Sequence, residues 1–206
     1  TGISDIFKRK DRIGKLSPDD RIDGLSCLVT GANSGLGKAV AIELARRGGR
    51  IMMAGRSDMR DARREICKKS GSRELYTEHI DLADLDSVGN CVKQFAKRGW
   101  TFDIVVINAG IVPKEARITK QGFEEMFQVN YLSNFHLVSL LLENGVVPNS
   151  IFNSGTTSQK RGKNTQPRRR PRIIFVSSET HRGAGPVNFE RFGSFRPYGP
   201  AGSVAE

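Results

Sequence analysis

Short apolar runs alternate along this chain with longer segments in which apolar residues recur at helical spacing. The short runs predict five strands, at residues 27–30, 50–54, 76–80, 102–108 and 173–177. The longer segments predict four helices, at residues 35–47, 58–70, 85–98 and 122–142. Regular alternation with short connections is typical of a parallel sheet covered by helices on both faces. The sequence therefore predicts an α/β fold, built as a three-layer, doubly wound parallel sheet.

Two segments show this pattern most clearly. The run 104–107, Ile-Val-Val-Ile, is apolar at every position, as expected for a central strand that is buried on both faces. In the first predicted helix, Leu36, Val40 and Leu44 recur every four residues, so we expect that side of the helix to pack on the sheet.

Three stretches lack the pattern. Residues 1–25 are polar and charged, and we interpret them as an N-terminal arm that lies on the domain. Residues 145–172 form a basic, polar insertion before the last strand, which we interpret as a mobile loop. Residues 193–206 are rich in Gly, Pro and Ser and are predicted to be loop. The 206 residues, 37% of them hydrophobic, predict a single domain.

The net charge of +11 is concentrated in the insertion. Between residues 156 and 172 the chain carries seven Lys and Arg residues and no acid, and without those seven the net charge is +4. A solvated basic loop explains this run, and contact with a polyanion or an acidic membrane is the alternative. Because the remaining surface is not strongly basic, we do not expect nucleic acid as a partner, although residues 160–172 are the segment that would bind it.

Cys27, Cys67 and Cys91 form no Cys-x-x-Cys pair, and their odd number indicates reduced thiols. We therefore expect a cytoplasmic or other reducing compartment and no metal site. No stretch approaches the roughly 18 apolar residues of a membrane span, and no secretory signal opens the chain. The sequence starts at Thr1 without a methionine, which leaves open a preceding segment and peripheral membrane association.

The segment 30–37, Thr-Gly-Ala-Asn-Ser-Gly-Leu-Gly, joins the first predicted strand to the first predicted helix. Glycines in such a turn let the backbone approach a phosphate, and the helix N-terminus offers unpaired N–H groups and a positive dipole end. A strand, a glycine turn and a helix in this order predict a site for a dinucleotide pyrophosphate. The expected contacts are Thr30, Gly31, Asn33, Ser34, Gly35, Leu36, Gly37 and Lys38.

The spacing Gly-x-x-x-Gly-x-Gly resembles that of the short-chain dehydrogenase/reductase family, and four further motifs of the family follow in order. The resemblance covers residues 25–196. It implies a Rossmann fold that binds a nicotinamide dinucleotide and transfers a hydride to or from a small carbonyl or alcohol substrate. Family members also commonly form homodimers.

The end of the second strand bears on the choice of cofactor. NAD-specific folds place an acid there to accept hydrogen bonds from the adenosine ribose, whereas here Gly55 holds that place and Arg56 follows it. A guanidinium pairs well with a 2′-phosphate, and Lys38 adds a second cation. We therefore expect NADP(H) in preference to NAD(H). A surface arginine at a strand end is the alternative.

Two motifs follow the third and fourth strands. The resemblance implies that Asp81 contacts the adenine amino group while Leu82 packs nearby, and capping of the next helix is the alternative role of Asp81. Asn108, Ala109 and Gly110 end the fourth strand, and the resemblance places them beside the cofactor ribose. The carboxyl edge of a parallel sheet faces the ligand crevice, which agrees with this placement.

Two residues are expected to take part in catalysis. Asn130 lies in the last predicted helix, where the family bends the helix and holds a water of a proton relay. A polar residue on an exposed face is the alternative. We expect residues 172–178 to form a buried strand ending in two serines. The resemblance assigns the substrate carbonyl to Ser178 and the nicotinamide side to Ser177.

His181 follows the serine pair, as it often does in the retinol-dehydrogenase-like branch of the family. That resemblance implies a lipophilic substrate such as a retinoid or a steroid. We do not count His181 among the catalytic residues.

The family's proton donor is a tyrosine with a lysine four residues later, and this sequence has no such pair. None of Tyr76, Tyr131 and Tyr198 has lysine at that spacing. We favour the interpretation that the domain is incomplete and lacks its last strands, so that the strand at 173–177 has an exposed edge. The alternative is a non-catalytic dinucleotide-binding or scaffold protein that contacts a partner through the basic loop.

Overall fold

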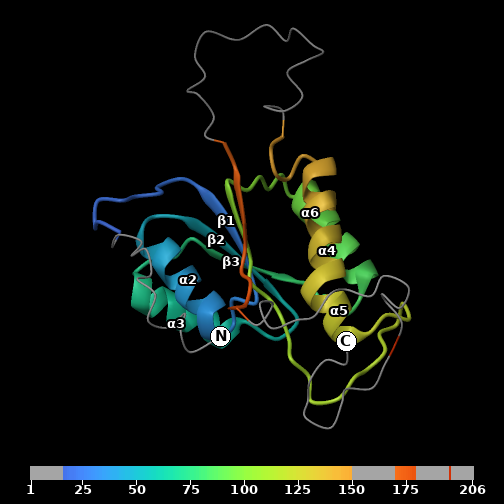
Figure 1. Cartoon of the computed structure of the whole chain (residues 1–206). Coiled ribbons are helices and arrows are strands. Elements are labelled where there is room, and N and C mark those ends of the chain that lie inside the picture. The colour runs from blue at the N-terminus through green and yellow to red at the C-terminus, as the bar shows by residue number, and fades with distance from the viewer. Residues whose placement is uncertain (1–15, 150–169, 180–194, 196–206) are drawn as a thin grey trace, which may run out of the picture.

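The computed structural model describes residues 16–149, 170–179 and 195. These residues form a five-stranded parallel sheet with the strand order β3-β2-β1-β4-β5 (Figure 1). The strands are β1 Ser26–Thr30, β2 Arg50–Gly55, β3 Leu75–His79, β4 Ile104–Ile107 and β5 Arg172–Phe175. The chain moves outward from β1 to β3 and then crosses back to place β4 on the other side of β1. Such a reversal opens a ligand crevice at the carboxyl ends of the strands.

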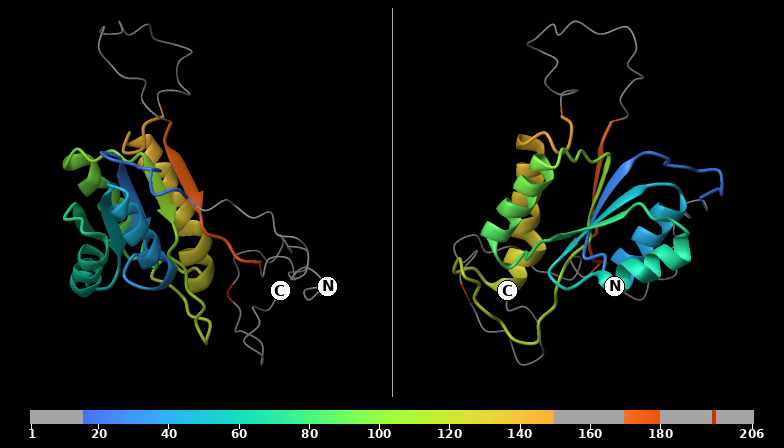
Figure 2. Two further views of the ribbon diagram at one scale, coloured as in Figure 1. Left: turned by 90° about the vertical axis from the view of Figure 1, so that its left-hand side faces the viewer. Right: turned by 180° about the vertical axis from the view of Figure 1, so that it is seen from behind.

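Helices cover both faces of the sheet, which confirms the three-layer, doubly wound fold (Figure 2). One face carries α2 Gly35–Arg46 and α3 Arg60–Ser70, and the other carries α4 Leu85–Lys97 and α6 Ser133–Glu143. A short helix α5, Glu125–Phe127, and a π-helix η1, Gln128–Leu132, lead directly into α6. In the described part of the chain, no helix is both long and apolar enough to cross a membrane.

Side chains of the central strands alternate between two hydrophobic cores. Leu28 and Met52 belong to the core that contains α4 and α6, whereas Val29 and Met53 belong to the core that contains α2 and α3. All four side chains are at most 1% exposed. This two-sided burial explains the continuous apolar runs from which the strands were predicted.

The helix predicted at residues 122–142 is divided in the structure. Gly122 lies in a turn with a φ of 85°, and α5 begins only at Glu125. The carboxylate of Glu124 accepts hydrogen bonds from the N–H groups of Met126 and Phe127 at 2.9 and 2.7 Å and so caps this start. The π-helix η1 then separates α5 from α6. The prediction of one continuous helix was therefore wrong.

The packing predicted for α2 also differs. Leu36 is 57% exposed, so it does not pack on the sheet as expected. The helix instead buries Gly37, Ala41 and Ala45. These small residues bring the helix axis close to the sheet and leave no room beneath the first turn for a leucine.

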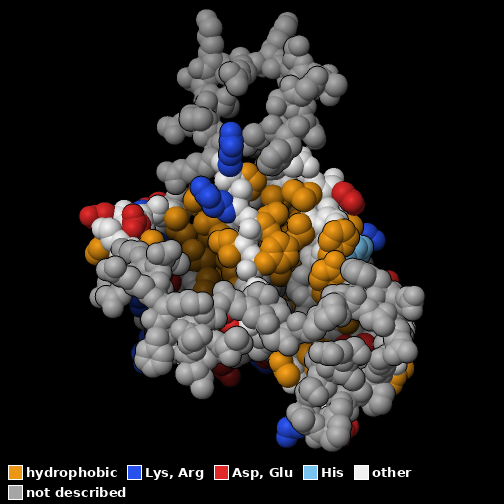
Figure 3. Space-filling model, in the orientation of Figure 1, with side chains coloured by type: hydrophobic (Ala, Val, Ile, Leu, Met, Phe, Trp, Pro, Cys, Tyr) orange, Lys and Arg blue, Asp and Glu red, His pale blue; other side chains and the backbone are white. Residues whose placement is uncertain are grey.

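The last strand is not buried, contrary to the prediction for residues 172–178. Among the described strands, β5 is the edge strand and pairs with β4 alone, and Ile174 and Phe175 are 47% and 56% exposed. In the view of Figure 3, hydrophobic side chains gather at the centre of the molecule, where β5 crosses it in Figure 1. An apolar run does not distinguish a central strand from an edge strand that lacks a neighbour. In the part of the chain that the structure describes, the expected unpaired edge of this strand is present.

Residues 16–25 of the expected N-terminal arm lie against the end of α2. The Arg47 guanidinium donates to the carbonyl oxygens of Ser17 and Asp20 at 2.8 and 2.7 Å, and the N–H of Ile22 donates to the carbonyl of Arg47 at 3.0 Å. Residues 1–15, most of the insertion at 145–172 and all of the predicted loop at 193–206 except Phe195 are outside the described residues.

Candidate functional site

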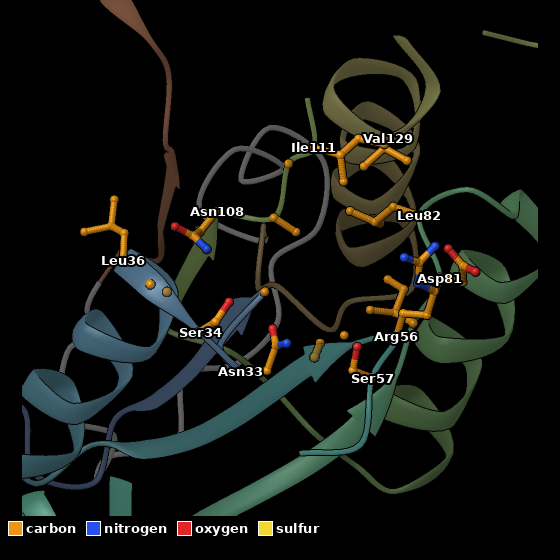
Figure 4. Close-up of a pocket in the computed structure, with 18 residues that line it drawn as sticks. Asn33, Ser34, Leu36, Arg56, Ser57, Asp81, Leu82, Asn108, Ile111 and Val129 are labelled. Carbon is orange, nitrogen blue, oxygen red and sulfur yellow. The ribbon is translucent and has the colours of Figure 1, made fainter. Parts of the chain in front are cut away.

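A cavity of about 370 Å³ opens at the carboxyl ends of the strands, where the fold predicts a ligand crevice (Figure 4). All predicted cofactor residues line it except Thr30, Lys38 and Ser177. The lining residues are Gly31, Asn33, Ser34, Gly35, Leu36, Gly37, Ala54, Gly55, Arg56, Ser57, Ile80, Asp81, Leu82, Asn108, Ala109, Gly110, Ile111 and Val129. The structure therefore brings four separate sequence motifs to one site.

The glycine turn gives this cavity an anion-binding end. Gly31 and Gly35 have φ angles of 67° and 50°, which L-residues with a side chain rarely adopt. At Gly37, a Cβ would lie 2.4 Å from the carbonyl oxygen of Gly31, so only glycine lets α2 start this close to β1. The Ser34 side chain makes no capping hydrogen bond, which leaves the first N–H groups of α2 available to a phosphate.

Thr30 connects the glycine turn to β4 from beneath the cavity. Its hydroxyl oxygen accepts hydrogen bonds from the N–H groups of Asn108 and Ala109 at 2.9 and 3.0 Å, and its carbonyl accepts from the Asn108 side chain at 3.0 Å. Thr30 is fully buried. It supports the lining residues Asn108 and Ala109 and is not itself part of the wall.

The two predicted cations lie in different surroundings. Arg56 follows β2, lines the cavity and lies beside Ser57 and Asp81 in Figure 4. Lys38 is outside the lining and forms an ion pair with Glu65 at 2.6 Å. This lysine lowers the pKa of Glu65 to about 2, with Lys69 as a second donor, so Glu65 is ionised at neutral pH. The geometry therefore favours Arg56 over Lys38 as the contact for an added phosphate.

Asp81 shapes the loop between β3 and α4. One carboxylate oxygen of Asp81 accepts from the N–H of Ala83 at 2.9 Å, and the Asp81 N–H donates to the hydroxyl of Ser87 at 2.9 Å. The N-cap of α4 is Asp84, whose side chain accepts from the N–H of Asp86. Asp81 thus stabilises the turn before α4 and lines the cavity, whereas Asp84 performs the helix capping that was considered for Asp81.

Asn130 lies within η1, at the helix irregularity that the family resemblance implies. Its carboxamide pairs with the backbone of Ile111, accepting from the N–H at 2.8 Å and donating to the carbonyl at 2.9 Å. Asn130 does not line the cavity, but Ile111 does. The side chain therefore positions the strand end after Gly110, and a role in a proton relay stays a prediction.

The structure does not bring the predicted serines into the cavity lining. Ser177 and Ser178 follow β5, and both are exposed. The strand pairing continues as far as Val176, whose N–H donates to the carbonyl of Ile107 at 2.9 Å. His181 lies outside the described residues. Within the described ranges, no group of three or more His, Cys, Asp or Glu side chains is arranged to hold a metal ion.

Six lining residues were not among the predicted cofactor contacts. Ala54, Gly55 and Ile80 lie at the ends of the second and third strands, and the other three are Ser57, Ile111 and Val129. Each of these last three is the immediate neighbour of a predicted residue: Ser57 follows Arg56, Ile111 follows Gly110, and Val129 precedes Asn130. The residue types gave little signal, because isoleucine and valine next to a motif are indistinguishable from core residues. The hydroxyl of Ser57, directly after a candidate phosphate-binding arginine, was the one usable sign.

A glycine turn and an uncapped helix start at the switch point of a doubly wound sheet define the class of dinucleotide-binding α/β proteins. Residues 26–154 match the short chain dehydrogenase family, and the chain belongs to that family of oxidoreductases. The predicted family and its retinol-dehydrogenase-like branch are confirmed by the curated relatives.

Two human relatives show the extent of the match. Retinol dehydrogenase 13 is 36% identical over 146 residues, which cover 68% of this chain and 44% of the relative. Retinol dehydrogenase 14 is 32% identical over 208 residues, which cover 94% of this chain and 56% of the relative. The chain thus spans about half the length of the curated relatives it matches.

Solved structures agree on the fold. The oxidoreductase yciK from E. coli superposes with a TM-score of 0.52 at 24% sequence identity, covering 63% of this chain and 55% of that one. At this identity the likeness supports the Rossmann architecture alone.

Proposed function

We propose that this chain is the cofactor-binding part of an NADP(H)-dependent oxidoreductase that interconverts an alcohol and a carbonyl compound. The observation that supports this most directly is the junction of β2 with the cavity. Gly55 stands where an NAD-specific fold has an acid, and Arg56 and Ser57 follow it in the lining. A guanidinium and a hydroxyl are suitable donors for a 2′-phosphate, and no carboxylate at that position repels it.

The remaining lining suits the other parts of the cofactor. The uncapped start of α2 with Gly31 and Gly35 would receive the pyrophosphate. Leu82 and Ile111 offer an apolar wall, with Asp81 beside it, for the adenine. Asn108 would lie near a ribose at the end of β4.

In the proposed reaction the bound nicotinamide supplies or accepts the hydride. Ser178 would donate its hydroxyl hydrogen bond to the substrate carbonyl and orient it, and Asn130 would hold a relay water. When a carbonyl is reduced, the alkoxide oxygen that forms must receive a proton. The 206 residues contain no Tyr-x-x-x-Lys pair to donate it. We therefore assign cofactor binding to this chain and do not assign the proton donor to any of its residues.

The names of the curated relatives support a lipophilic substrate for this protein. Two of them are named retinol dehydrogenases, and the chain is at least 32% identical to both.

Binding titrations with NADPH and NADH test the proposal. The purified chain should bind NADPH, seen as enhanced nicotinamide fluorescence, and should bind NADH more weakly. Equal affinity for both cofactors would refute the NADP(H) assignment, and no binding of either would refute the dinucleotide site.

The missing Tyr-x-x-x-Lys pair supports a second candidate, a dinucleotide-binding protein without catalysis. Turnover distinguishes the two functions. NADPH should be oxidised when a panel of lipophilic aldehydes and ketones is added to the protein as isolated from its source. Tight NADPH binding without any turnover in that preparation would favour the non-catalytic function.

A further inference from the structure

The proposed base-binding end of the cavity has an apolar wall made by three separate segments. Leu82 comes from the loop after β3, Ile111 from the loop after β4, and Val129 from η1, and their side chains lie together in Figure 4. Loops are easily displaced unless their backbone groups are bonded to rigid elements. The position of Leu82 in this wall therefore depends on the hydrogen bonds that its backbone makes.

The carbonyl oxygen of Leu82 accepts two hydrogen bonds from side chains outside its own loop. The Ser133 hydroxyl donates to it at 2.6 Å, and Nε2 of Gln128 lies at 3.4 Å. Both donor residues are 0% exposed. A buried carbonyl without a donor is strongly disfavoured, so these two side chains hold the Leu82 backbone where it is.

The π-helix makes this double contact geometrically feasible. Gln128 and Ser133 are five residues apart, and in a regular α-helix such residues point about 140° away from each other. The i→i+5 bonding of a π-helix brings them to the same side. Asn134 supports the wider turn, because its side-chain Nδ2 donates to the carbonyls of Val129 and Asn130 at 3.2 and 3.0 Å.

The same segment fixes the second part of the wall through Asn130, which pairs with both backbone groups of Ile111. Residues 128–134 thus contribute Val129 directly and hold the backbones of Leu82 and Ile111 by side-chain hydrogen bonds. The side chains of Gln128, Asn130 and Ser133 are not part of the cavity lining.

We infer that Ser133 is a positioning residue for the adenine-binding wall, acting through the Leu82 carbonyl. The inference rests on the proposed dinucleotide site and adds to it a buried residue that touches no part of the cofactor. Loss of the hydroxyl would release the loop at residues 81–84 and weaken contacts to the adenine half of the cofactor, while the glycine turn would bind phosphate as before.

Ser133→Ala tests this with probes for the two halves of the site. Adenosine 2′,5′-bisphosphate probes the adenine end, and inorganic pyrophosphate probes the glycine turn, each by competition with NADPH. Removing one hydrogen bond to a buried carbonyl should lower the affinities for NADPH and for adenosine 2′,5′-bisphosphate by the same factor of about ten. Pyrophosphate affinity should not change. Amide hydrogen exchange at residues 81–84 of the free protein should become faster.

Ser139→Ala is the matched control, because Ser139 lies on the same helix outside this network and undergoes the same chemical change. It should leave all three affinities unchanged. Ser133→Cys retains a weak donor and should give an intermediate affinity for adenosine 2′,5′-bisphosphate. If Ser133→Ala does not fold, the same measurements are made on Ser133→Cys.

If Ser133→Ala lowered the affinities for pyrophosphate and for adenosine 2′,5′-bisphosphate equally, the inference would be overturned, because this would indicate general loss of structure. Unchanged affinities in Ser133→Ala would overturn it as well. Failure of the unmodified chain to bind NADPH and both probes would instead refute the proposed function, so the two failures are distinguishable.

Discussion

The β1 side and the β5 side of the site are built differently. On the β1 side, the glycine turn and the loops after β2, β3 and β4 enclose a cavity above strands whose core side chains are almost fully buried. On the β5 side, Ser177 and Ser178 follow a strand with one neighbour and do not line that cavity. Within the described residues, the same parallel sheet thus carries a cavity beside β1 and an edge strand, β5, with a single strand neighbour.

The difference follows from which contacts fix each side. β1 pairs with β2 and β4, and the Thr30 hydroxyl joins β1 to the lining residues Asn108 and Ala109. Among the described residues, β5 has only β4 as a strand neighbour. Cofactor binding and catalysis should therefore be separable: substitutions on the β1 side should change cofactor binding, and substitutions in β5 should not.

Gly37→Ala should have the largest effect on the β1 side. A Cβ at this position would lie 2.4 Å from the Gly31 carbonyl oxygen and 2.4 Å from Nδ2 of Asn108. Because both neighbours are fixed, α2 would have to move away from the turn. We expect NADPH affinity to fall by about a hundredfold or more, measured by fluorescence titration.

Gly89→Ala in α4 is the control for that change, because a Cβ at Gly89 meets nothing within 4 Å. It should preserve affinity and raise the melting temperature, since alanine stabilises a helix interior by about 1 kcal/mol relative to glycine. Wild-type affinity in Gly37→Ala would show that the turn does not depend on the close approach of α2.

Thr30→Val should weaken the connection between β1 and β4. Valine has nearly the shape of threonine but accepts no hydrogen bond, so the N–H groups of Asn108 and Ala109 lose their partner in a buried position. We expect the free energy of unfolding to fall by about 2–4 kcal/mol, measured by urea denaturation. Thr77→Val, at an exposed position of β3, should change the free energy of unfolding by less than about 0.5 kcal/mol. Similar losses in both variants would contradict a special role for the Thr30 hydroxyl.

Arg56→Ala and Lys38→Ala should distinguish the roles of the two cations that the sequence suggested as contacts for a 2′-phosphate. Removing a guanidinium that pairs with a 2′-phosphate should lower NADPH affinity by about tenfold or more and leave NADH affinity nearly unchanged. Lys38→Ala should have little effect on either cofactor, because Lys38 is paired with Glu65 outside the cavity lining. Calorimetric titrations with both cofactors measure this. A larger loss of NADPH affinity in Lys38→Ala than in Arg56→Ala would instead make Lys38 the contact for the 2′-phosphate.

Local patterns were sufficient to predict the β1 side. The glycine turn at 30–37, Arg56 and Asp81 each follow directly from a strand, and parallel strands bring such positions to one edge of the sheet. The lining residues they form were therefore predictable without any contact between distant segments being known.

What the sequence could not reveal depends on long-range contacts. The isolated sequence does not show that Lys38 faces Glu65, because that ion pair joins α2 to α3. The burial of β5 depends on neighbours that no pattern within residues 172–178 specifies. The π-helix is accompanied by side-chain donors such as Asn134, whose spacing to Asn130 is also that of an ordinary helical turn.

Leu36→Ser and Phe175→Ser compare the two sides by replacing a large, exposed apolar side chain with serine on each. The two side chains are 57% and 56% exposed, so burial alone predicts equal consequences. Leu36 lines the cavity and Phe175 does not. We expect Leu36→Ser to weaken NADPH binding by about threefold, since part of an apolar contact is lost. Phe175→Ser should leave the affinity unchanged and reduce aggregation in light scattering, because it makes an open strand edge more polar. If Phe175→Ser weakened NADPH binding as much as Leu36→Ser did, β5 would have to contribute to the cofactor site, and the two sides would not be separable.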